Sequence, residues 1–242
     1  MTILITGSTG ALGSELEKIF PDSISPTHKE FDICDLSTVR NFFNKHKIDI
    51  VIHTAALTTV RGCEENKSLA MKVNVEGTHN LVSEFKNSNP DGKFVYISTA
   101  CVFDGHSGMY DELSIPNPKN FYSLTKLLGE CEVKSLTNSL IIRTNFVSRK
   151  KWPYPKAFTD RFGTYLFSDQ IAHGIHEVIQ NNLDGIIHIV GDKKISMFEL
   201  AKLTTPDIQP MTLDDYSGPP LTIDMSLDTK SWKKYNITQN KV

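Results

Sequence analysis

The chain has 242 residues, of which 39% are hydrophobic and 22% charged, enough for one large α/β domain with a substantial buried core. Its formal net charge is -2, and its Lys and Arg residues are spread along the chain, so the composition does not indicate nucleic acid or an anionic membrane surface as a partner. No apolar run approaches the roughly 20 residues of a membrane-spanning helix, and the first residues do not resemble a signal peptide, so we expect a cytoplasmic protein with no membrane partner.

Short apolar runs alternate with helical patterns along most of the chain. In chain order, the expected elements are a strand at 2–6, a helix at 11–20, a strand at 23–25, a helix at 36–46, a strand at 48–53, a helix at 64–85, a strand at 93–98, a helix at 117–136, a strand at 139–144, a helix at 169–180, a strand at 185–190 and a helix at 196–203. Asp35 is the expected N-cap of the helix at 36–46. This alternation predicts an α/β fold with a Rossmann-type doubly wound parallel sheet and helices on both faces.

The amino-acid composition shifts near Arg149, and the tail from Thr204 onward is polar and rich in proline. We therefore expect residues 1–148 to form an NAD(P)-binding Rossmann domain. Residues 149–242 would form a small C-terminal substrate-binding region that contributes in part to the sheet.

Three glycines follow the first strand at a regular spacing, in the turn Thr6-Gly7-Ser8-Thr9-Gly10-Ala11-Leu12-Gly13. Gly7 would permit the tight turn, Gly10 would let backbone approach a pyrophosphate, and Gly13 would let the helix pack closely on the strand. Nucleotide binding requires this position between a strand and a helix, because the free N–H groups at the start of a helix attract anions. The expected cofactor contacts in this turn are Gly7, Thr9, Gly10, Ala11, Leu12 and Gly13.

Tyr122 and Lys126 stand four residues apart on the helix expected at 117–136, so they share one helix face. An ammonium beside the phenol would lower the tyrosine pKa from about 10 and make Tyr122 a general acid for a carbonyl that is being reduced. Such a pair on its own is more often part of an exposed surface. Ser98 and Thr99, however, place two hydroxyls at the carboxyl end of a buried strand, where open α/β sheets bind their ligands.

Together, the glycine turn, the strand-end Ser-Thr and the Tyr-x-x-x-Lys pair resemble the extended short-chain dehydrogenase/reductases. Further segments narrow the resemblance to the dTDP-4-dehydrorhamnose reductases: FDICD at 31–35, HTAA at 53–56, VNVEGT at 73–78, YSLTKLLGE at 122–130 and LDT at 227–229. The resemblance runs along nearly the whole chain. It implies an NAD(P)-dependent oxidoreductase that transfers hydride from the nicotinamide to C4 of a nucleotide-linked 4-keto-6-deoxysugar.

The resemblance also implies roles for individual residues. Thr99, Tyr122 and Lys126 would form the catalytic triad, in which Tyr122 gives the proton to the alkoxide and Lys126 also binds ribose hydroxyls. Asn74 would steady the helix that carries the lysine, often through water. The remaining cofactor contacts would be Asp32 and Ile33 at the adenine, with Ala55, Ala56, Leu57 and Ser98 at the strand ends.

The identity of the cofactor depends on the segment that follows the second strand. An acid there would hold the ribose 2′-hydroxyl and favour NADH, whereas basic residues would favour the 2′-phosphate of NADPH. His28 falls where the family often has an arginine, and Lys29 follows it, so we expect NADPH. Glu30 keeps NADH open as an alternative.

The chain departs from the family on the substrate side. Ala100-Cys101 stands where the family usually carries Asp-Tyr, Phe146 stands where a tryptophan is common, and Gly218-Pro219-Pro220 offers no arginine. The identity of the sugar therefore stays open. Two other functions stay open as well, a nucleotide-sugar epimerase of the same superfamily and a non-catalytic NADP-binding regulatory subunit. The intact triad counts against the regulatory subunit.

The resemblance implies a nucleotide-sugar substrate and leaves room for a homodimer through the two long helices. No metal site is expected, because the four cysteines form no C-x-x-C pair. His173 and His176 could share one helix face, but no carboxylate or cysteine completes a ligand set beside them.

Overall fold

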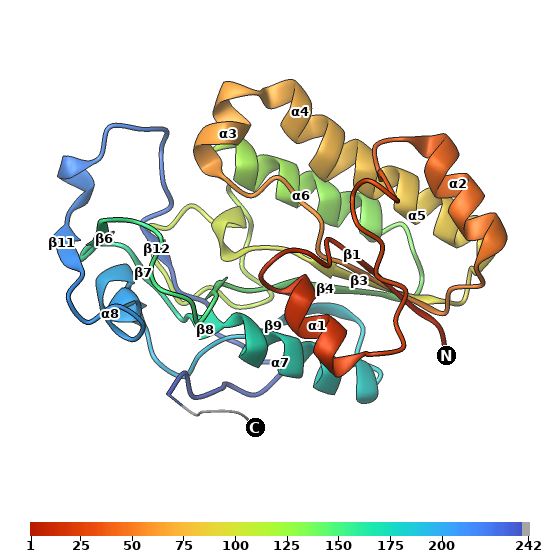
Figure 1. The fold of residues 1–242 in the computed structure, drawn as a ribbon. Helices are drawn as coiled ribbons and strands as arrows, with labels where there is room; N and C mark the ends of the chain where they lie inside the picture. Colours follow the sequence, from red (N-terminus) through yellow and green to blue (C-terminus); the bar gives the residue numbers. More distant parts are fainter. Residues whose placement is uncertain (239–242) are drawn as a thin grey trace.

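A five-stranded parallel sheet forms the centre of the fold in the computed structural model, which describes residues 1–238 (Figure 1). Its strands lie in the order β1 (Ile3–Thr6), β2 (Ile50–His53), β3 (Lys93–Ile97), β4 (Ser139–Arg143) and β9 (Gly185–His188). Every pairing in this sheet is parallel, because its strands are joined by crossover connections rather than by hairpins.

On its outer side, β1 meets a single bridge partner, since Leu4 pairs with Ile24. The strand expected at 23–25 is thus reduced to one bridge, because Pro26 has no N–H with which to extend the ladder. The chain crosses from this edge back over β1 to reach β2, so the direction of winding reverses at β1. Such a reversal opens a crevice at the carboxyl ends of the strands.

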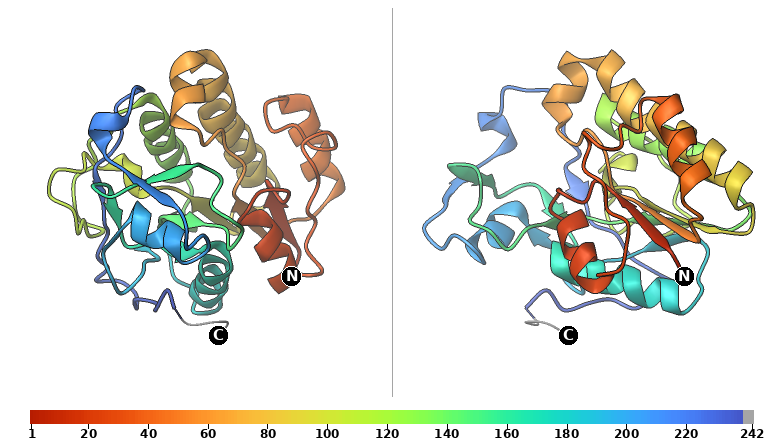
Figure 2. Two further views of the ribbon diagram at one scale, coloured as in Figure 1. Left: turned by 60° about the vertical axis from the view of Figure 1, so that its left-hand side comes forward. Right: turned by 45° about the vertical axis from the view of Figure 1, so that its right-hand side comes forward.

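Helices cover both faces of the sheet, and Figures 1 and 2 show the two layers. One layer holds α2 (Leu36–Lys45), α5 (Gly77–Ser88) and α6 (Phe121–Val133), and the other holds α1 (Gly13–Ile19) and α7 (Ser168–Gln180). Successive side chains of β1 enter different cores: Ile3 and Ile5 belong to the core under α1 and α7, and Leu4 belongs to the core under α2 and α5. The predicted doubly wound α/β fold is confirmed.

The prediction of a single helix at 64–85 is wrong, because the chain forms four consecutive helical segments there. These are α3 (Val60–Glu65), α4 (Lys67–Met71), a π-helical turn η1 (Lys72–Glu76) and α5 (Gly77–Ser88). Asn66 ends the first piece and starts the second, since its Oδ1 accepts a hydrogen bond from the Leu69 N–H at 3.0 Å. The π-turn holds Asn74, a residue expected in the site, and such turns are frequent at functional sites.

Side-chain caps also set where two other helices begin. Asp35 caps α2 as expected, because its Oδ1 accepts from the Ser37 N–H at 3.0 Å. The helix expected from residue 117 begins instead at Phe121, since the Oδ1 of Asn120 accepts from the Ser123 N–H at 2.9 Å. This start places Tyr122 in the first turn of α6 and Lys126 one turn further on.

Short strands after β4, which the sequence analysis did not predict, build a second, smaller part of the molecule. They form three small sheets, β5 (Phe146–Val147) with β8 (Leu166–Phe167), β6 (Lys156–Phe158) with β11 (Gln209–Met211), and β7 (Phe162–Gly163) between β10 (Ile195–Ser196) and β12 (Asp224–Met225). The helix expected at 196–203 is present as α8 (Met197–Lys202), capped by Ser196. Two short 3-10 helices, η2 (Ala100–Val102) and η3 (Leu213–Asp215), complete the elements. Within residues 1–238, no helix is long and apolar enough to cross a membrane.

Candidate functional site

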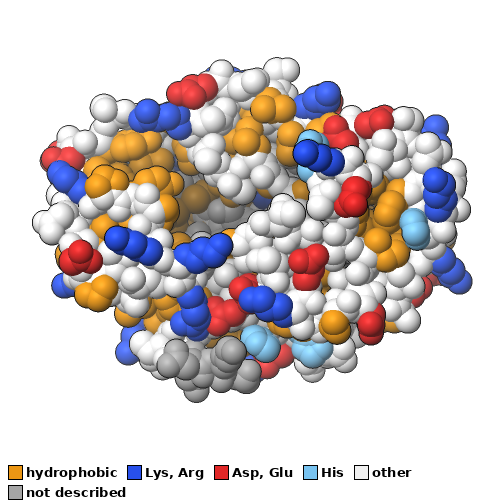
Figure 3. Space-filling model, in the orientation of Figure 1, with side chains coloured by type: hydrophobic (Ala, Val, Ile, Leu, Met, Phe, Trp, Pro, Cys, Tyr) orange, Lys and Arg blue, Asp and Glu red, His pale blue; other side chains and the backbone are white. Residues whose placement is uncertain are grey.

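A cleft of about 730 Å³ lies at the carboxyl ends of β1, β2, β3 and β4. The β1–α1 turn and α6 line it together with residues from the small sheets of the C-terminal part. Figure 3 shows a hollow between the lobe that holds β6, β7 and α8 and the part that holds the sheet. Of the residues expected in the site, all except Leu57 and Asn74 line this cleft.

The glycine turn has the backbone geometry that its spacing predicted. Gly7 has a φ of +74°, and a Cβ there would lie 2.6 Å from the backbone nitrogen of Ala55. A Cβ at Gly13 would overlap the carbonyl oxygen of Gly7, so α1 can pack onto the turn only with glycine at this position. The Gly10 N–H donates to the same Gly7 oxygen at 3.0 Å, which closes the turn at the edge of the cleft.

Thr99, Tyr122 and Lys126 come together in the cleft from the end of β3 and from α6. Burial raises the pKa of Tyr122 well above its usual value, and a hydrogen bond with Thr99 opposes this rise. The lysine does not have the expected effect of lowering the tyrosine pKa, because burial dominates the environment of both groups. A phenol that stays protonated at neutral pH is suited to donate a proton.

Lys126 is buried and sits against the face of an aromatic ring. Burial lowers its pKa to about 7, while the carboxylate of Glu130, one turn further along α6, opposes this shift. Its Nζ lies 4.0 Å from the centroid of the Tyr96 ring, and the Tyr96 hydroxyl donates to the carbonyl oxygen of Lys126 at 3.3 Å. These contacts fix the lysine and its helix on β3.

Asn74 connects the π-turn to two segments of the site. Its Nδ2 donates to the Thr125 hydroxyl at 2.9 Å and to the Leu57 carbonyl oxygen at 3.0 Å, and its Oδ1 accepts from the Leu57 N–H at 2.8 Å. The contact with the lysine helix is therefore direct rather than through water. Leu57, expected to line the cofactor site, instead contributes its backbone to this connection and lies outside the cleft lining.

Ser98 lines the cleft, but its hydroxyl is already committed to a buried carboxylate. It donates to Oε1 of Glu130 at 2.5 Å. The same carboxylate accepts two hydrogen bonds from Arg143, at 2.9 Å from Nε and 2.7 Å from the terminal nitrogen Nη2. All three side chains are buried, so β3, α6 and β4 are joined behind Lys126 by a charged group that the sequence analysis missed.

The residues that bear on the choice between NADPH and NADH lie in the segment between α1 and α2. His28 lines the cleft, whereas Lys29 and Glu30 do not. The carboxylate of Glu30 instead accepts from the backbone N–H and the hydroxyl of Thr27, both at 2.8 Å. Glu30, whose acidic side chain left NADH as an alternative cofactor, is thus held away from the cleft. The carboxylate of Asp32 accepts a hydrogen bond from the Cys34 N–H at 2.9 Å.

Arg161 and Tyr165 line the cleft from the C-terminal part, and both were missed by the sequence analysis. Arg161 is buried, its Nε donates to the Thr222 carbonyl oxygen at 3.0 Å, and its two terminal nitrogens contact the sulfurs of Met197 and Met225. Within residues 1–238, no carboxylate lies within ion-pair distance of this guanidinium. Thioethers are weak acceptors, so Arg161 is a buried cation with capacity left for an anion.

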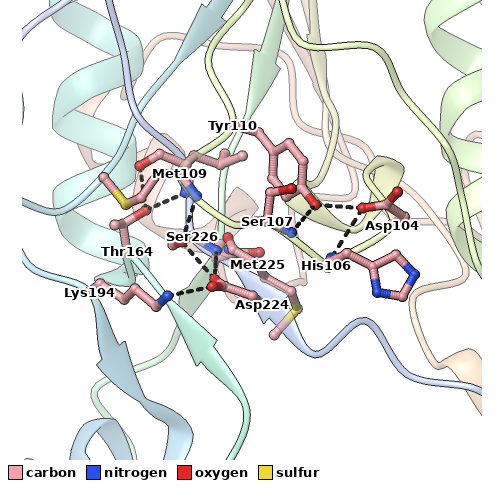
Figure 4. Close-up of polar contacts among 12 residues, drawn as sticks. Asp104, His106, Ser107, Met109, Tyr110, Thr164, Lys194, Asp224, Met225 and Ser226 are labelled. Atoms are coloured by element: carbon pink, nitrogen blue, oxygen red, sulfur yellow. Dashed lines mark hydrogen bonds and ion pairs between the residues drawn. The ribbon is translucent and has the colours of Figure 1, made fainter.

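The loop at 104–110, which follows η2, packs against β12 and supports this side of the cleft (Figure 4). The Asp224 carboxylate accepts from Lys194 and, at 2.6 Å, from the Ser226 hydroxyl. A Cβ at Gly108 would overlap this carboxylate, so the loop passes close to it. In the same region, Cys101 lines the cleft at the position where the family usually has a tyrosine.

Comparison with known proteins places the chain in a defined group. The model for the RmlD substrate binding domain matches residues 1–212. The spore coat polysaccharide biosynthesis protein SpsK of Bacillus subtilis (strain 168) is 34% identical over 219 residues, which cover 82% of this chain and 76% of that protein. The family model therefore spans the glycine turn, the residues of the candidate triad and residues 149–212 of the C-terminal part.

Solved structures share the fold over nearly the whole chain. A dTDP-4-dehydrorhamnose reductase of Clostridium acetobutylicum superposes with a TM-score of 0.86 at 29% identity, covering 94% of this chain and 90% of that one. A dTDP-4-dehydrorhamnose reductase of Bacillus anthracis in complex with NADP superposes with a TM-score of 0.89 at 24% identity, over 98% of this chain and 95% of that one.

Proposed function

The chain belongs to the RmlD substrate-binding domain family, and from this premise we propose that it is an NAD(P)H-dependent reductase of a nucleotide-linked 4-keto-6-deoxysugar. The observation that carries the proposal is the meeting of Thr99, Tyr122 and Lys126 in one cleft with the glycine turn. An acid, a hydroxyl and an amine at the carboxyl ends of parallel strands are the groups that a carbonyl reduction requires.

The residues of the cleft fit a dinucleotide. The turn at Gly7, Gly10 and Gly13 leaves no room for a Cβ at its first and last glycines and brings bare backbone to the cleft, as binding of a pyrophosphate requires. When bound, the cofactor supplies the hydride that reduces C4 of the sugar. Its adenine would lie beside Asp32 and Ile33, and its ribose hydroxyls would reach Lys126.

The protein's own part in the reaction is to position the carbonyl and to supply a proton. Tyr122 donates this proton to the carbonyl oxygen, which becomes the hydroxyl of the product. Burial keeps the tyrosine protonated until that moment, and Thr99, whose hydroxyl opposes the effect of burial on the tyrosine pKa, lines the same cleft. Lys126, in its ammonium form, would bind the ribose hydroxyls of the cofactor, and solvent then returns the proton to the phenolate.

The C-terminal residues 149–242 are proposed to hold the nucleotide-sugar. The buried cation Arg161 supports this assignment, because a nucleotide-sugar carries an anionic diphosphate and the guanidinium has no carboxylate partner within residues 1–238.

The proposal also includes a cytoplasmic protein that forms a homodimer through α5 and α6. A molar mass in solution near twice that of the chain would support the dimer.

Turnover of the wild-type protein tests the proposal directly. We expect oxidation of NADPH, followed by loss of its absorbance, when dTDP-4-keto-6-deoxysugars are generated in the same reaction. The reduced sugar must appear in equal amount, because each turnover consumes one hydride and one proton. NADPH binding without reduction of any of these sugars would contradict the reductase and favour a regulatory subunit.

We expect NADPH to be preferred over NADH because of His28. The residue lines the cleft where a 2′-phosphate would lie, while the competing acid Glu30 is bonded to Thr27. Replacing His28 with Ala should raise the KM for NADPH about threefold to fivefold, the scale of an exposed charge contact, and leave the KM for NADH unchanged.

Lys29→Ala is the matched control for His28→Ala, since Lys29 is the neighbouring basic residue but lies outside the cleft lining. Its KM values for both cofactors should equal those of the wild type. An equal loss for NADPH and NADH in His28→Ala would show that His28 does not distinguish the 2′-phosphate.

A further inference from the structure

The hydroxyl of Tyr165 is a buried polar group with no hydrogen-bond partner within residues 1–238. The residue lies between β7 and β8, is 4% exposed and lines the cleft. Leaving a buried hydroxyl unsatisfied costs about 1–3 kcal/mol, so a protein gains nothing from such a group unless a ligand completes it. Phenylalanine would fill the same space without this cost.

The ring of Tyr165 is fixed by glycines on both sides of its backbone. A Cβ at Gly163 would lie 2.7 Å from the ring carbon Cζ, so the ring folds back over a position that only glycine can occupy. A Cβ at Gly191 would lie 2.6 Å from the Tyr165 carbonyl oxygen. The Gly191 N–H also donates to the Thr164 carbonyl oxygen at 3.0 Å, which ties the segment down. The hydroxyl is therefore held in one place.

The polar groups around Tyr165 are already bonded to other partners. Figure 4 shows Asp224 occupied by Lys194 and Ser226. The Thr164 hydroxyl donates to the Leu227 carbonyl oxygen and accepts from the Leu227 N–H, both at 3.0 Å. None of these groups therefore satisfies the Tyr165 hydroxyl.

The electrostatic neighbours of Tyr165 place it close to the reacting centre. Cys101 raises the pKa of both Tyr122 and Tyr165, so this one thiol lies within electrostatic range of the proton donor and of the unpaired phenol. Arg161, the cation available for an anion, lowers the pKa of Tyr165 and so also lies within electrostatic range of it. Tyr165 therefore shares one cleft with the proton donor and with a cation that can bind an anion.

We propose that Tyr165 is a specificity-determining residue whose hydroxyl forms a hydrogen bond with an oxygen of the sugar ring of the substrate. The inference rests on the proposed function and adds the residue that recognises the sugar. Tyr122, Arg161 and Tyr165 line one cleft, which suits a molecule that carries both a reacting carbonyl and a diphosphate.

Tyr165→Phe tests this inference, because it removes only the hydroxyl. We expect the KM for the nucleotide-linked 4-keto-6-deoxysugar to rise about fivefold to tenfold, the range of one neutral hydrogen bond, with kcat and the KM for NADPH nearly unchanged. The Tm of the free variant should equal or exceed that of the wild type, since no native hydrogen bond is lost. The rise in Tm caused by a dTDP-linked sugar should be smaller for the variant.

Tyr216→Phe is the matched control, because Tyr216 belongs to the same C-terminal part but lies outside the cleft lining and is only partly buried. Its KM and Tm values should equal those of the wild type. An unchanged KM and an unchanged ligand-induced Tm shift in Tyr165→Phe would overturn the inference while wild-type turnover still supports the reductase. Absence of wild-type turnover would instead count against the proposed function, and a raised KM for NADPH alone would assign Tyr165 to the cofactor.

Discussion

Tyr122→Phe is expected to lower kcat for reduction of the keto-sugar by about a hundredfold or more, the scale of a missing general acid. The phenol is the group of the cleft best suited to give a proton, because burial keeps its pKa high. Phenylalanine keeps the ring and removes only the hydroxyl. The loss should therefore fall on the chemical step rather than on folding or on the affinity for NADPH.

The measurement is a single-turnover reaction with enzyme in excess, which reports the chemical step without product release. NADPH affinity and Tm are measured beside it, and both should stay close to the wild-type values. Tyr216→Phe again serves as control, since it removes a phenol that lies outside the cleft lining. A rate within threefold of the wild type would mean that water or another side chain donates the proton.

The parts of this site that follow local rules were predictable from the sequence. The roles of Gly7 and Gly13 follow from three-residue spacing after a strand, and the placement of Lys126 behind Tyr122 follows from the helical period. Asn74 was assigned by resemblance to the steadying of the lysine helix, and it bonds Thr125 on that helix. The glycine spacing and the Tyr122–Lys126 spacing depend on a single turn or helix, whereas the role of Asn74 came only from the resemblance, because its contact joins η1 to α6.

Features that depend on distant contacts or on burial could not be predicted in the same way. Arg161 and Tyr165 come from the segment around β7. This strand has only two residues, too few to show the alternation of apolar and polar residues that identifies a strand in the sequence. The pKa of Tyr122 was expected to fall beside an ammonium, but its sign depends on desolvation, which only the packed structure shows. Similarly, nothing in the segment at 96–103 indicates that the Ser98 hydroxyl points to Glu130 rather than into the cleft.

Glu130→Gln is expected to lower the free energy of unfolding by about 3–5 kcal/mol, because removing one partner of a buried ion pair leaves the other charge unpaired. Glu130 and Arg143 are at most 1% exposed, and the carboxylate also accepts from Ser98. The measurement is unfolding in urea at neutral pH. The control is Glu15→Gln, which removes an exposed pair with Lys18 and should cost less than about 1 kcal/mol.

A second variant separates loss of charge pairing from loss of packing. Arg143→Met leaves the Glu130 carboxylate buried without its cation, whereas combining it with Glu130→Gln leaves no buried charge at all. The double variant should therefore be more stable than Arg143→Met alone. If the loss of stability in the double variant equals the sum of the losses in the two single variants, the pair contributes through packing rather than through its charges.

Glu130 is further expected to act on the reaction through Lys126, as a positioning residue. The carboxylate opposes the effect of burial, which lowers the lysine pKa to about 7. Without it the pKa falls further, so Lys126 loses its ammonium form, which exists below the pKa, at a lower pH. The fall in kcat/KM with rising pH should therefore begin at lower pH in Glu130→Gln than in the wild type. An unshifted profile, with stability reduced as expected, would restrict Glu130 to holding β3, α6 and β4 together.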